Sequence, residues 1–133
     1  MNIDNSSRKD TGDTGESAAC EYLRGRGFQI LGRNIAFKTG ELDIIAQKGS
    51  TIHVVEVKTL QCSSFPDPNQ WSQGDDYSPA DNLSPYKLRK VRRTAEWYLA
   101  QKGWEGEWQI DGALVWLRVR DGVARVRYLP QVG

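Results

Sequence analysis

The sequence predicts a single α/β domain with the element order α-β-β-β-α-β-β. Two segments repeat small or apolar residues at helical spacing, and five segments show the alternation or the β-branched content of strands. The length of 133 residues fits one domain with a hydrophobic core of its own. We therefore expect one folded unit over residues 13–133. The polar, aperiodic residues 1–12 are expected to be a disordered lead-in.

The first half of the unit is expected to be a helix followed by a β-meander. Small and apolar residues recur at helical spacing over residues 13–26, and Gly27 follows as a C-cap candidate. After the meander, residues 61–81 are rich in Ser, Pro, Asp, Gln and Gly without any period, which predicts a long exposed loop. The three strands are expected at residues 28–37, 41–47 and 51–59.

Ser84 and Pro85 predict the start of the second helix. A hydroxyl side chain is a favoured N-cap, and proline at the first helical position loses no hydrogen bond because its N–H would be unpaired there. The apolar residues that follow fall on about one third of the helical circumference, and Gly103 comes after them. We therefore expect an amphipathic helix over residues 85–101.

The last two strands are expected to form a hairpin around Asp121-Gly122. This dipeptide is favoured in two-residue type I′ turns. The resulting register would place Arg118 opposite Arg125, a repulsion that a bound anion would relieve. Alternatively, the arginines protect an edge strand from aggregation. The strands are expected at residues 108–119 and 123–129.

The supply of metal ligands in the sequence excludes most zinc sites. The chain has one histidine, His53, and two cysteines, Cys20 and Cys62, too few for a four-ligand structural zinc site or for three histidines around a catalytic zinc. The same scarcity weakens any Ser-His-Asp or Cys-His interpretation, because only one imidazole is available. A metal ion would therefore be held by oxygen ligands.

The cysteines and the hydropathy pattern bear on location. The two cysteines lie 42 residues apart, and the chain does not start with a secretory signal pattern. The longest uninterrupted apolar run, 113–117, has five residues, far fewer than the ~20 that cross a bilayer. We expect a cytoplasmic protein without a membrane span.

Gly49-Ser50 sets the register of the two central strands. Glycine at the first position of a two-residue loop is typical of a type II′ turn, and this loop pairs Lys48 with Thr51. Asp43 then faces Glu56. A slip by one residue would place charged residues opposite apolar ones, so the hydrophobic pattern supports the same register.

Two opposed carboxylates require a cation, because like charges directly across a strand pair are destabilising. Lys58, two residues after Glu56, supplies one cation, and a divalent ion would supply another. Mg²⁺ or Mn²⁺ suits this setting, because Mg²⁺ binds one or two carboxylates together with substrate phosphate. Lys58 can then orient or deprotonate a water while the metal polarises a phosphodiester. The pattern points to metal-assisted phosphodiester hydrolysis.

Each of these acidic residues also has a purely structural interpretation. Asp43, Glu56 and Lys58 fit a solvated face of an amphipathic hairpin, with Lys58 paired to Glu41. Glu16 fits the last position of a capping box that begins at Asp13, which would make its carboxylate part of a helix cap. Spacing by itself leaves both interpretations open.

The net charge of +1 hides an uneven distribution. Residues 1–86 carry 8 basic and 12 acidic groups, whereas residues 87–133 carry 10 basic and 5 acidic groups. A basic cluster opens the second half and suits contacts to phosphates, which dominate nucleic-acid affinity; an ordinary solvated helix face is the alternative. The five tryptophans suit base stacking, although packing is the commoner use of such side chains. The cluster consists of Lys87, Arg89, Lys90, Arg92 and Arg93.

Several motifs follow one another along the chain. They are Gly15-Glu16-x-Ala18-Ala19-x-x-Tyr22-Leu23, Arg33-Asn34, Gly40-Glu41-Leu42-Asp43-Ile44-Ile45-Ala46 and Val54-Val55-Glu56-Val57-Lys58-Thr59. In this order they resemble the YraN family of small bacterial proteins, which is classed with the PD-(D/E)XK, restriction-endonuclease-like (tRNA-endonuclease-like) superfamily. The resemblance covers residues 12–115, most of the chain.

The resemblance implies a restriction-endonuclease-like core with a mixed sheet flanked by helices. It implies that Asp43 and Glu56 are metal ligands, with Glu16 on the first helix joining them, and that Lys58 lies near the attacking water. Glu41 and Asp111 are expected to support the site, and Asp111 resembles the aspartate of the family's Phe-Asp-Val motif. The sequence departs from the family at Leu60, where arginine is common, and in the length of the loop at 61–81.

We therefore expect a Mg²⁺- or Mn²⁺-dependent endonuclease or exonuclease acting on DNA, including branched or processed structures. Nucleases of this superfamily often act as dimers, so a homodimer is part of that expectation. The alternative is a non-catalytic nucleic-acid-binding module, or an interaction protein, that keeps the nuclease fold.

Overall fold

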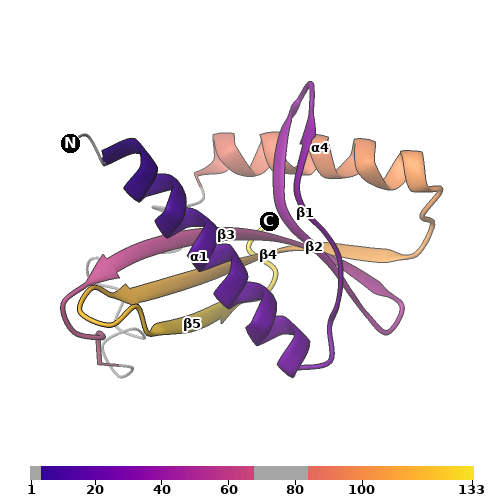
Figure 1. Ribbon diagram of the computed structural model, residues 1–133. Helices are drawn as coiled ribbons and strands as arrows, with labels where there is room; N and C mark the ends of the chain where they lie inside the picture. The colour runs from indigo at the N-terminus through magenta and orange to yellow at the C-terminus, as the bar shows by residue number, and fades with distance from the viewer. Residues whose placement is uncertain (1–3, 68–83) are drawn as a thin grey trace.

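Within residues 4–67 and 84–133, five strands form one mixed sheet, and the helices α1 and α4 cover its opposite faces (Figure 1). The computed structural model describes residues 4–67 and 84–133. The predicted α/β class and the order α-β-β-β-α-β-β are confirmed. The elements are α1 (Asp4–Gly25), β1 (Gln29–Phe37), β2 (Gly40–Lys48), β3 (Thr51–Cys62), α4 (Pro85–Lys102), β4 (Glu107–Arg118) and β5 (Ala124–Leu129).

The sheet order follows the chain order, β1-β2-β3-β4-β5. The first three strands form an antiparallel meander, and β4 and β5 form an antiparallel hairpin. Only β3 and β4 run parallel, because α4 connects them across one face of the sheet. The expected mixed sheet is therefore present, with its parallel pair at the centre.

The central strands are buried on both faces. Neighbouring residues of β3 illustrate this: Val55 packs in the cluster that includes α1, and Val54 packs in the cluster that includes α4. Successive side chains of a strand point to opposite faces, so the two helices cover opposite sides of the sheet. On β2 the alternation breaks at Leu42, which joins the α4 cluster although Ile44 joins the α1 cluster.

The first helix is longer than predicted. It begins at Asp4, nine residues before the expected start at Asp13, so the stretch expected to be a disordered lead-in is helical from Asp4 onward. Hydrophobic periodicity detects a helix by its apolar face, and this extension has none. At Thr11, near the end of this extension, the hydroxyl accepts a hydrogen bond from the side-chain amide of Gln61 on β3 over 3.1 Å.

The second helix begins and ends where the sequence predicts. The Ser84 hydroxyl accepts a hydrogen bond from the backbone N–H of Lys87, with Pro85 at the first helical position. Gly103 ends the helix in the left-handed region at φ 67°, a conformation that glycine adopts without steric cost. Neither of the two helices within the described ranges is long and apolar enough to cross a membrane.

The β4–β5 loop is two residues longer than predicted. The Arg118 N–H donates to the Val123 carbonyl over 2.9 Å, which leaves a four-residue loop over 119–122 in place of a two-residue turn. The Asp121 carboxylate holds this wider loop, because it accepts hydrogen bonds from the Arg118 guanidinium and from the Val123 N–H. Arg125 lies opposite Trp116, so the predicted opposition of Arg118 and Arg125 is wrong.

The predicted loop at 61–81 starts later than expected. β3 continues to Cys62, three residues beyond the predicted end, because its far half pairs with β4. Residues 68–81 of that loop lie outside the described residues.

A glycine sets the distance between α1 and the sheet. A Cβ atom at Gly15 would lie 1.9 Å from the Thr59 hydroxyl and 2.9 Å from its Cβ, whereas a Cβ at Gly12, one turn earlier, would meet nothing within 4 Å. Only a residue without a side chain lets the helix approach β3 this closely. The approach brings the next residue, Glu16, to the sheet.

We expect Gly15→Ala to lower the free energy of unfolding by about 1–3 kcal/mol, because the added methyl group overpacks a buried contact. Gly12→Ala is the matched control in the same helix, and its better helix propensity is expected to raise stability by up to about 1 kcal/mol. Urea unfolding of both variants checks the prediction. Equal effects of the two substitutions would contradict it.

Candidate active site

The β2 and β3 strands separate at the two carboxylates that the sequence singled out. They pair from Lys48–Thr51 to Ile44–Val55, in the predicted register. Beyond that point β2 pairs only with β1, and β3 pairs only with β4, so the strands diverge as a fork (Figure 1). Asp43 and Glu56 are the first residues past the last pair.

At the fork, each carboxylate accepts a backbone hydrogen bond from the other strand. Asp43 Oδ2 accepts from the Val57 N–H at 2.9 Å, and Glu56 Oε2 accepts from the Asp43 N–H at 3.4 Å. These contacts satisfy N–H groups that the diverging strands no longer pair. Within residues 4–67 and 84–133, Oδ1 of Asp43 and Oε1 of Glu56 have no hydrogen-bond partner.

Burial and mutual repulsion make this carboxylate pair a strong candidate for a cation. Glu56 is only 5% exposed. Burial, followed by the neighbouring charge of Asp43, raises the pKa of Glu56 to about 8. Burial also raises the pKa of Asp43, against the hydrogen bond from Val57 and the positive charge of Lys87. A cation between the free oxygens would relieve both penalties.

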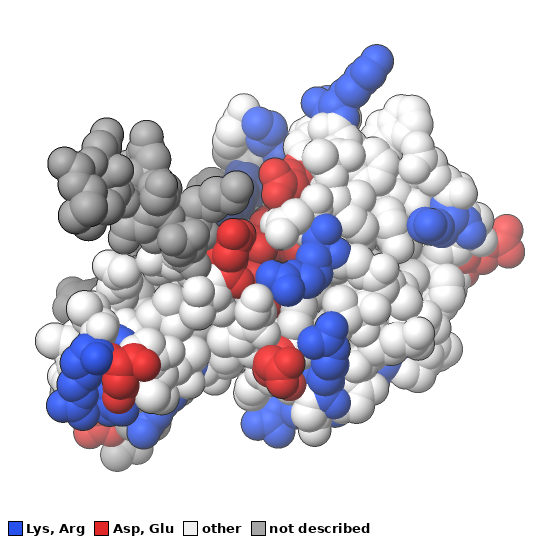
Figure 2. Space-filling model, viewed as in Figure 1, with Lys and Arg blue, Asp and Glu red and all other residues white. Residues whose placement is uncertain are grey.

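A cavity of about 570 Å³ opens beside Asp43 and collects residues from both helices. It brings together three of the four residues predicted to be catalytic, Glu16, Asp43 and Lys58, and adds Lys87 from α4. Figure 2 shows acidic side chains gathered where α1 crosses the sheet, with basic side chains beside them. The lining residues are Thr11, Gly12, Glu16, Asp43, Val57, Lys58, Thr59, Leu60, Gln61 and Lys87.

Glu56 reaches a second, smaller cavity of about 190 Å³ between the β1–β2 hairpin and α4. Lys87 lines both cavities and therefore stands between them. The two carboxylates thus line different cavities that have Lys87 in common. The smaller cavity is lined by Thr39, Gly40, Glu41, Glu56, Lys87, Lys90, Val91 and Thr94.

Among the described residues, Lys87 supplies a positive charge close to both carboxylates, although the sequence predicts that it contacts nucleic acid. Its positive charge lowers the pKa of Asp43 and of Glu56 against the effect of burial. The helical pattern carried a signal for this position: Lys87 lies four and seven residues before the buried Val91 and Thr94, so it shares their side of the helix.

Lys58 lies at the cavity as an exposed side chain. In the described parts of the chain its ammonium group forms no ion pair. Glu41 lies opposite Ala36 of β1, because β2 has left β3 at this height. The interpretation that paired Lys58 with Glu41 across the hairpin is therefore wrong, and Lys58 keeps its charge directed to the cavity rim.

Glu16 is a half-buried acid on the middle of α1, with its side chain 14% exposed. The capping-box interpretation is wrong, because Asp13 lies inside the helix, which begins at Asp4. Oε1 of Glu16 is buried and has no hydrogen-bond partner in the part of the chain that the structure describes; it lies 3.9 Å from the Arg33 guanidinium. Burial raises the pKa of Glu16, and a hydrogen bond from Asn34 opposes that shift.

Asn34 adopts a left-handed backbone conformation at φ 50°, which asparagine tolerates better than most residues. It lies in β1 between Arg33, which pairs with Ile44, and Ile35, which pairs with Leu42, and so stands beside Asp43. In the sequence, Arg33-Asn34 is recognisable only as part of a motif, without an indication that it lies near Glu16. Their backbone geometry is what brings both side chains to Glu16.

The five residues of the predicted basic cluster on α4 are all exposed, and they have different neighbours. Lys87 and Lys90 line the cavities. The Arg92 guanidinium lies 5.2 Å from the centre of the Trp108 ring, while Arg89 and Arg93 are exposed on the outer side of the helix. Only two of the five residues therefore adjoin the carboxylates.

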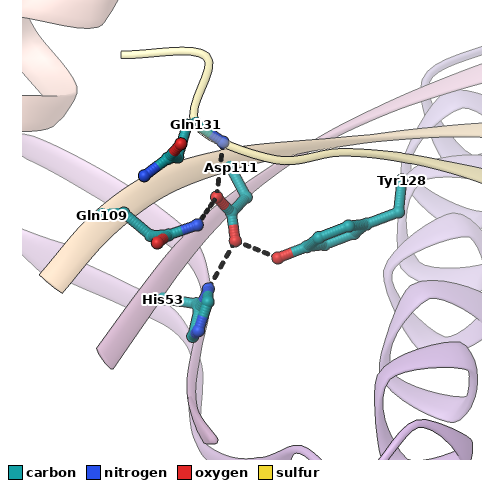
Figure 3. A network of polar contacts seen from close by, with 5 residues as sticks. All are labelled: His53, Gln109, Asp111, Tyr128 and Gln131. Atoms are coloured by element: carbon teal, nitrogen blue, oxygen red, sulfur yellow. Dashed lines mark hydrogen bonds and ion pairs between the residues drawn. The ribbon is translucent and has the colours of Figure 1, made fainter. Parts of the chain in front are cut away.

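Asp111 lies in a separate buried network (Figure 3) and lines neither cavity. Its carboxylate is fully buried and receives four hydrogen bonds, one of them from the Tyr128 hydroxyl. Burial, with Asp111 beside it, raises the pKa of Tyr128, so the hydroxyl keeps its proton. The other donors are His53 Nδ1 at 2.6 Å, Gln109 Nε2 at 2.7 Å and the backbone N–H of Gln131 at 2.8 Å.

The donor set fits a divalent ion held by two carboxylates. Over residues 4–67 and 84–133, no three His, Cys, Asp or Glu side chains lie close enough together to hold a metal ion. Mg²⁺ is commonly bound through one or two carboxylates, with waters and substrate phosphate completing its coordination. The free oxygens of Asp43 and Glu56 match that requirement, and Glu16 adds a third acid at the same cavity.

Comparison with known proteins gives one consistent result. Residues 15–119 match the model of a family described as Uncharacterised protein family UPF0102. A UPF0102 protein of Campylobacter jejuni is 38% identical over 75% of this chain and 78% of its own length. Relatives from Helicobacter pylori and Caldicellulosiruptor saccharolyticus are 33% and 32% identical over 86% and 92% of this chain, and over 89% and 95% of their own lengths.

The raised pKa of Glu56 predicts a loss of stability with rising pH. The folded protein retains a proton up to about pH 8 that the unfolded chain releases near the ordinary pKa of 4.5, so the free energy of unfolding falls as the pH rises between these values. Glu56→Gln keeps an oxygen that accepts the Asp43 N–H but cannot ionise. We expect the free energy of unfolding of this variant to fall less than that of the wild type between about pH 5 and about pH 8.

Urea unfolding across that pH range tests the prediction. Glu41→Gln is the matched control, because Glu41 is exposed, and we expect its pH dependence to follow the wild type. Parallel curves for Glu56→Gln and the wild type would show that Glu56 does not hold the proton.

Asp111→Ala is expected to lower the free energy of unfolding by about 3–5 kcal/mol, because it leaves several buried donors without an acceptor. Tyr128→Phe removes one of the four hydrogen bonds and is expected to cost about 1.5–3 kcal/mol. Urea unfolding measures both, with Asp13→Ala on the exposed side of α1 as the control. A cost for Asp111→Ala no larger than that of the control would contradict a structural role for the network.

Proposed function

Because the chain belongs to the uncharacterised protein family UPF0102, we propose its function from the site itself, as a metal-dependent nuclease that hydrolyses phosphodiester bonds of DNA. The observation that carries the proposal is the carboxylate pair at the strand fork. Asp43 and Glu56 are partly or fully buried, repel one another, and keep one oxygen each without a partner in the described residues. Stable burial of such a pair calls for a cation.

The sequence order supports the same conclusion. Asp43 followed by Glu56-Val57-Lys58 resembles the motif of the restriction-endonuclease-like superfamily, and the mixed sheet with a helix on each face resembles its core. The fork supplies the physical reason for that motif here. Because the strands separate there, the side chains of Asp43 and Glu56 each line a cavity.

Asp43 and Glu56 would hold Mg²⁺ or Mn²⁺, with Glu16 contributing through a water. The bound ion would polarise the phosphodiester and lower the pKa of a coordinated water. Lys58, exposed at the rim without an ion pair among the described residues, would orient the attacking water or contact the scissile phosphate. Lys87, which lines both cavities, would hold a phosphate oxygen and stabilise the charge that develops there.

The proposal extends to the compartment. Cys20 and Cys62 are free thiols, which agrees with a reducing environment. We therefore place the protein in the cytoplasm, together with its DNA substrate.

One observation favours a second candidate function. The carboxylates of Asp43 and Glu56 already satisfy backbone N–H groups at the fork, which gives them a structural use without any metal. A nucleic-acid-binding module that keeps the nuclease fold without turnover would also retain them. This candidate differs from the first in requiring neither metal binding nor cleavage.

We expect calorimetric titration to detect Mn²⁺ binding by the full chain, and Asp43→Asn to weaken it by at least tenfold. The amide oxygen of the variant still accepts the Val57 N–H, so the fork is preserved while the charge is lost. Lys58→Ala is expected to keep metal binding and to lose about 100-fold or more in cleavage rate. Lys102→Ala, an exposed lysine at the far end of α4, is the control.

Cleavage is measured on single-stranded, duplex and branched DNA with either metal. Metal binding that Asp43→Asn leaves unchanged would overturn the nuclease proposal, as would the absence of cleavage on every substrate. Nucleic-acid binding without metal binding would instead support the non-catalytic module.

A further inference from the structure

The outer side of α4 carries a stripe of alternating aromatic and basic side chains. We name Tyr86, Lys90, Arg93 and Trp97 the α4 stripe; they follow one another at intervals of four, three and four residues. At about 100° per residue these four positions fall within an arc of about 60°. The buried face of the helix is centred on the other side, at Val91, Thr94, Ala95, Tyr98 and Leu99.

Both aromatic side chains of the stripe are open to solvent. Tyr86 is 64% exposed and Trp97 is 53% exposed, whereas Tyr98 on the opposite face is 6% exposed. The Lys90 ammonium lies 5.4 Å from the centre of the Tyr86 ring, so an aromatic face and a positive charge occur together. A single exposed aromatic residue is ordinary, but two on one helical line with two cations between them form a defined surface.

The stripe adjoins the carboxylate site. Lys90 belongs to the stripe and also lines the smaller cavity with Glu56 and Lys87. The stripe spans twelve residues from Tyr86 to Trp97, and the eleven steps between them correspond to about 16 Å along a helix. A ligand lying along it would therefore extend from the cavity to the far half of α4.

The charge of α4 favours a polyanion. The helix carries six basic residues and a single acidic residue, Glu96. Its first turn contains no acidic side chain, so the end next to the cavity is entirely positive. A helix with this composition attracts phosphates. Its exposed aromatic side chains favour a partner that also carries bases.

We propose that the α4 stripe binds an unpaired nucleic-acid strand, with bases stacked on Tyr86 and Trp97 and phosphates contacted by Lys90 and Arg93. Proteins that bind single strands combine positive charge along the backbone with aromatic side chains on which bases stack. In a duplex the faces of the bases are occupied by their neighbours, so the two aromatic side chains would have no equivalent role there. The stripe selects strands whose bases are exposed.

This proposal deepens the proposed function and rests on it for one point only, the use of the bound strand as substrate. If the carboxylates cut nucleic acid, the stripe supplies an unpaired segment to them, and the substrate class is a nucleic acid that contains single-stranded regions. Binding by the stripe itself requires no metal. The two ideas can therefore fail separately.

The test is fluorescence anisotropy of labelled oligothymidine and oligouridine with the full chain, in the presence of a chelator that removes metal ions. We expect Tyr86→Ala and Trp97→Ala to weaken binding by about tenfold each, since stacking on an aromatic residue contributes strongly to each base bound. Trp97→Phe keeps a stacking surface and is expected to retain most of the affinity. Val119→Ala is the matched control, because Val119 is 67% exposed but lies outside the helix.

A labelled duplex of the same length supplies the second comparison. We expect the aromatic substitutions to leave duplex affinity unchanged, whereas replacing Lys90 and Arg93 together with alanine lowers affinity for both forms and reduces the salt dependence. The ratio of oligothymidine to oligouridine affinity distinguishes DNA from RNA as the source of the strand.

Single-strand binding that Tyr86→Ala and Trp97→Ala leave unchanged would overturn the proposal and reduce the stripe to an electrostatic surface. Equal losses for duplex and single strand would also overturn it. Loss of single-strand binding in a protein that binds no Mn²⁺ would support the stripe while contradicting the nuclease.

Discussion

The separation of β2 from β3 past Ile44 and Val55 is the constraint on which the site depends. Backbone N–H groups that leave a ladder near the core must find new acceptors, and the carboxylates of Asp43 and Glu56 provide them across the fork. The same contacts fix both side chains at the cavities. Their burial raises both pKa values, so the fork is satisfied in its hydrogen bonds and unfavourable in its electrostatics. That combination is the basis on which we propose a bound cation at this position.

The two helices complete the fork from opposite faces of the sheet. On one face, Gly15 allows α1 to approach Thr59, and this approach carries Glu16 to the cavity beside Asp43. On the other face, α4 packs through its apolar side and brings Lys87 between the two cavities. The parallel pairing of β3 with β4 requires a crossover of this kind. The topology that makes the sheet mixed therefore also delivers a cation to the carboxylates.

The basic residues of α4 divide by helical position into two uses. Lys87 lies on the side that meets the hairpin and the carboxylates, while Arg93 lies on the solvent side with Tyr86 and Trp97. Lys90 stands at the boundary, where it lines the smaller cavity and contacts Tyr86. A net charge of +1 for the whole chain gives no indication of this arrangement. Glu16, Asp43 and Glu56 lie at the fork, and α4 beside it carries six basic residues.

Local patterns in the sequence determined the element order, the ends of α4 and the central register, because period, capping residues and the Gly49-Ser50 turn act between near neighbours. That register was enough to bring Asp43 and Glu56 together. The tertiary structure decided two features that local patterns do not predict: the start of α1, where the sequence has no apolar face, and the β4–β5 loop, which the Asp121 carboxylate widens. It also placed Lys87 at the carboxylates and Asp111 in a separate network. Such contacts join residues far apart in the chain, and no local pattern records which pairs meet.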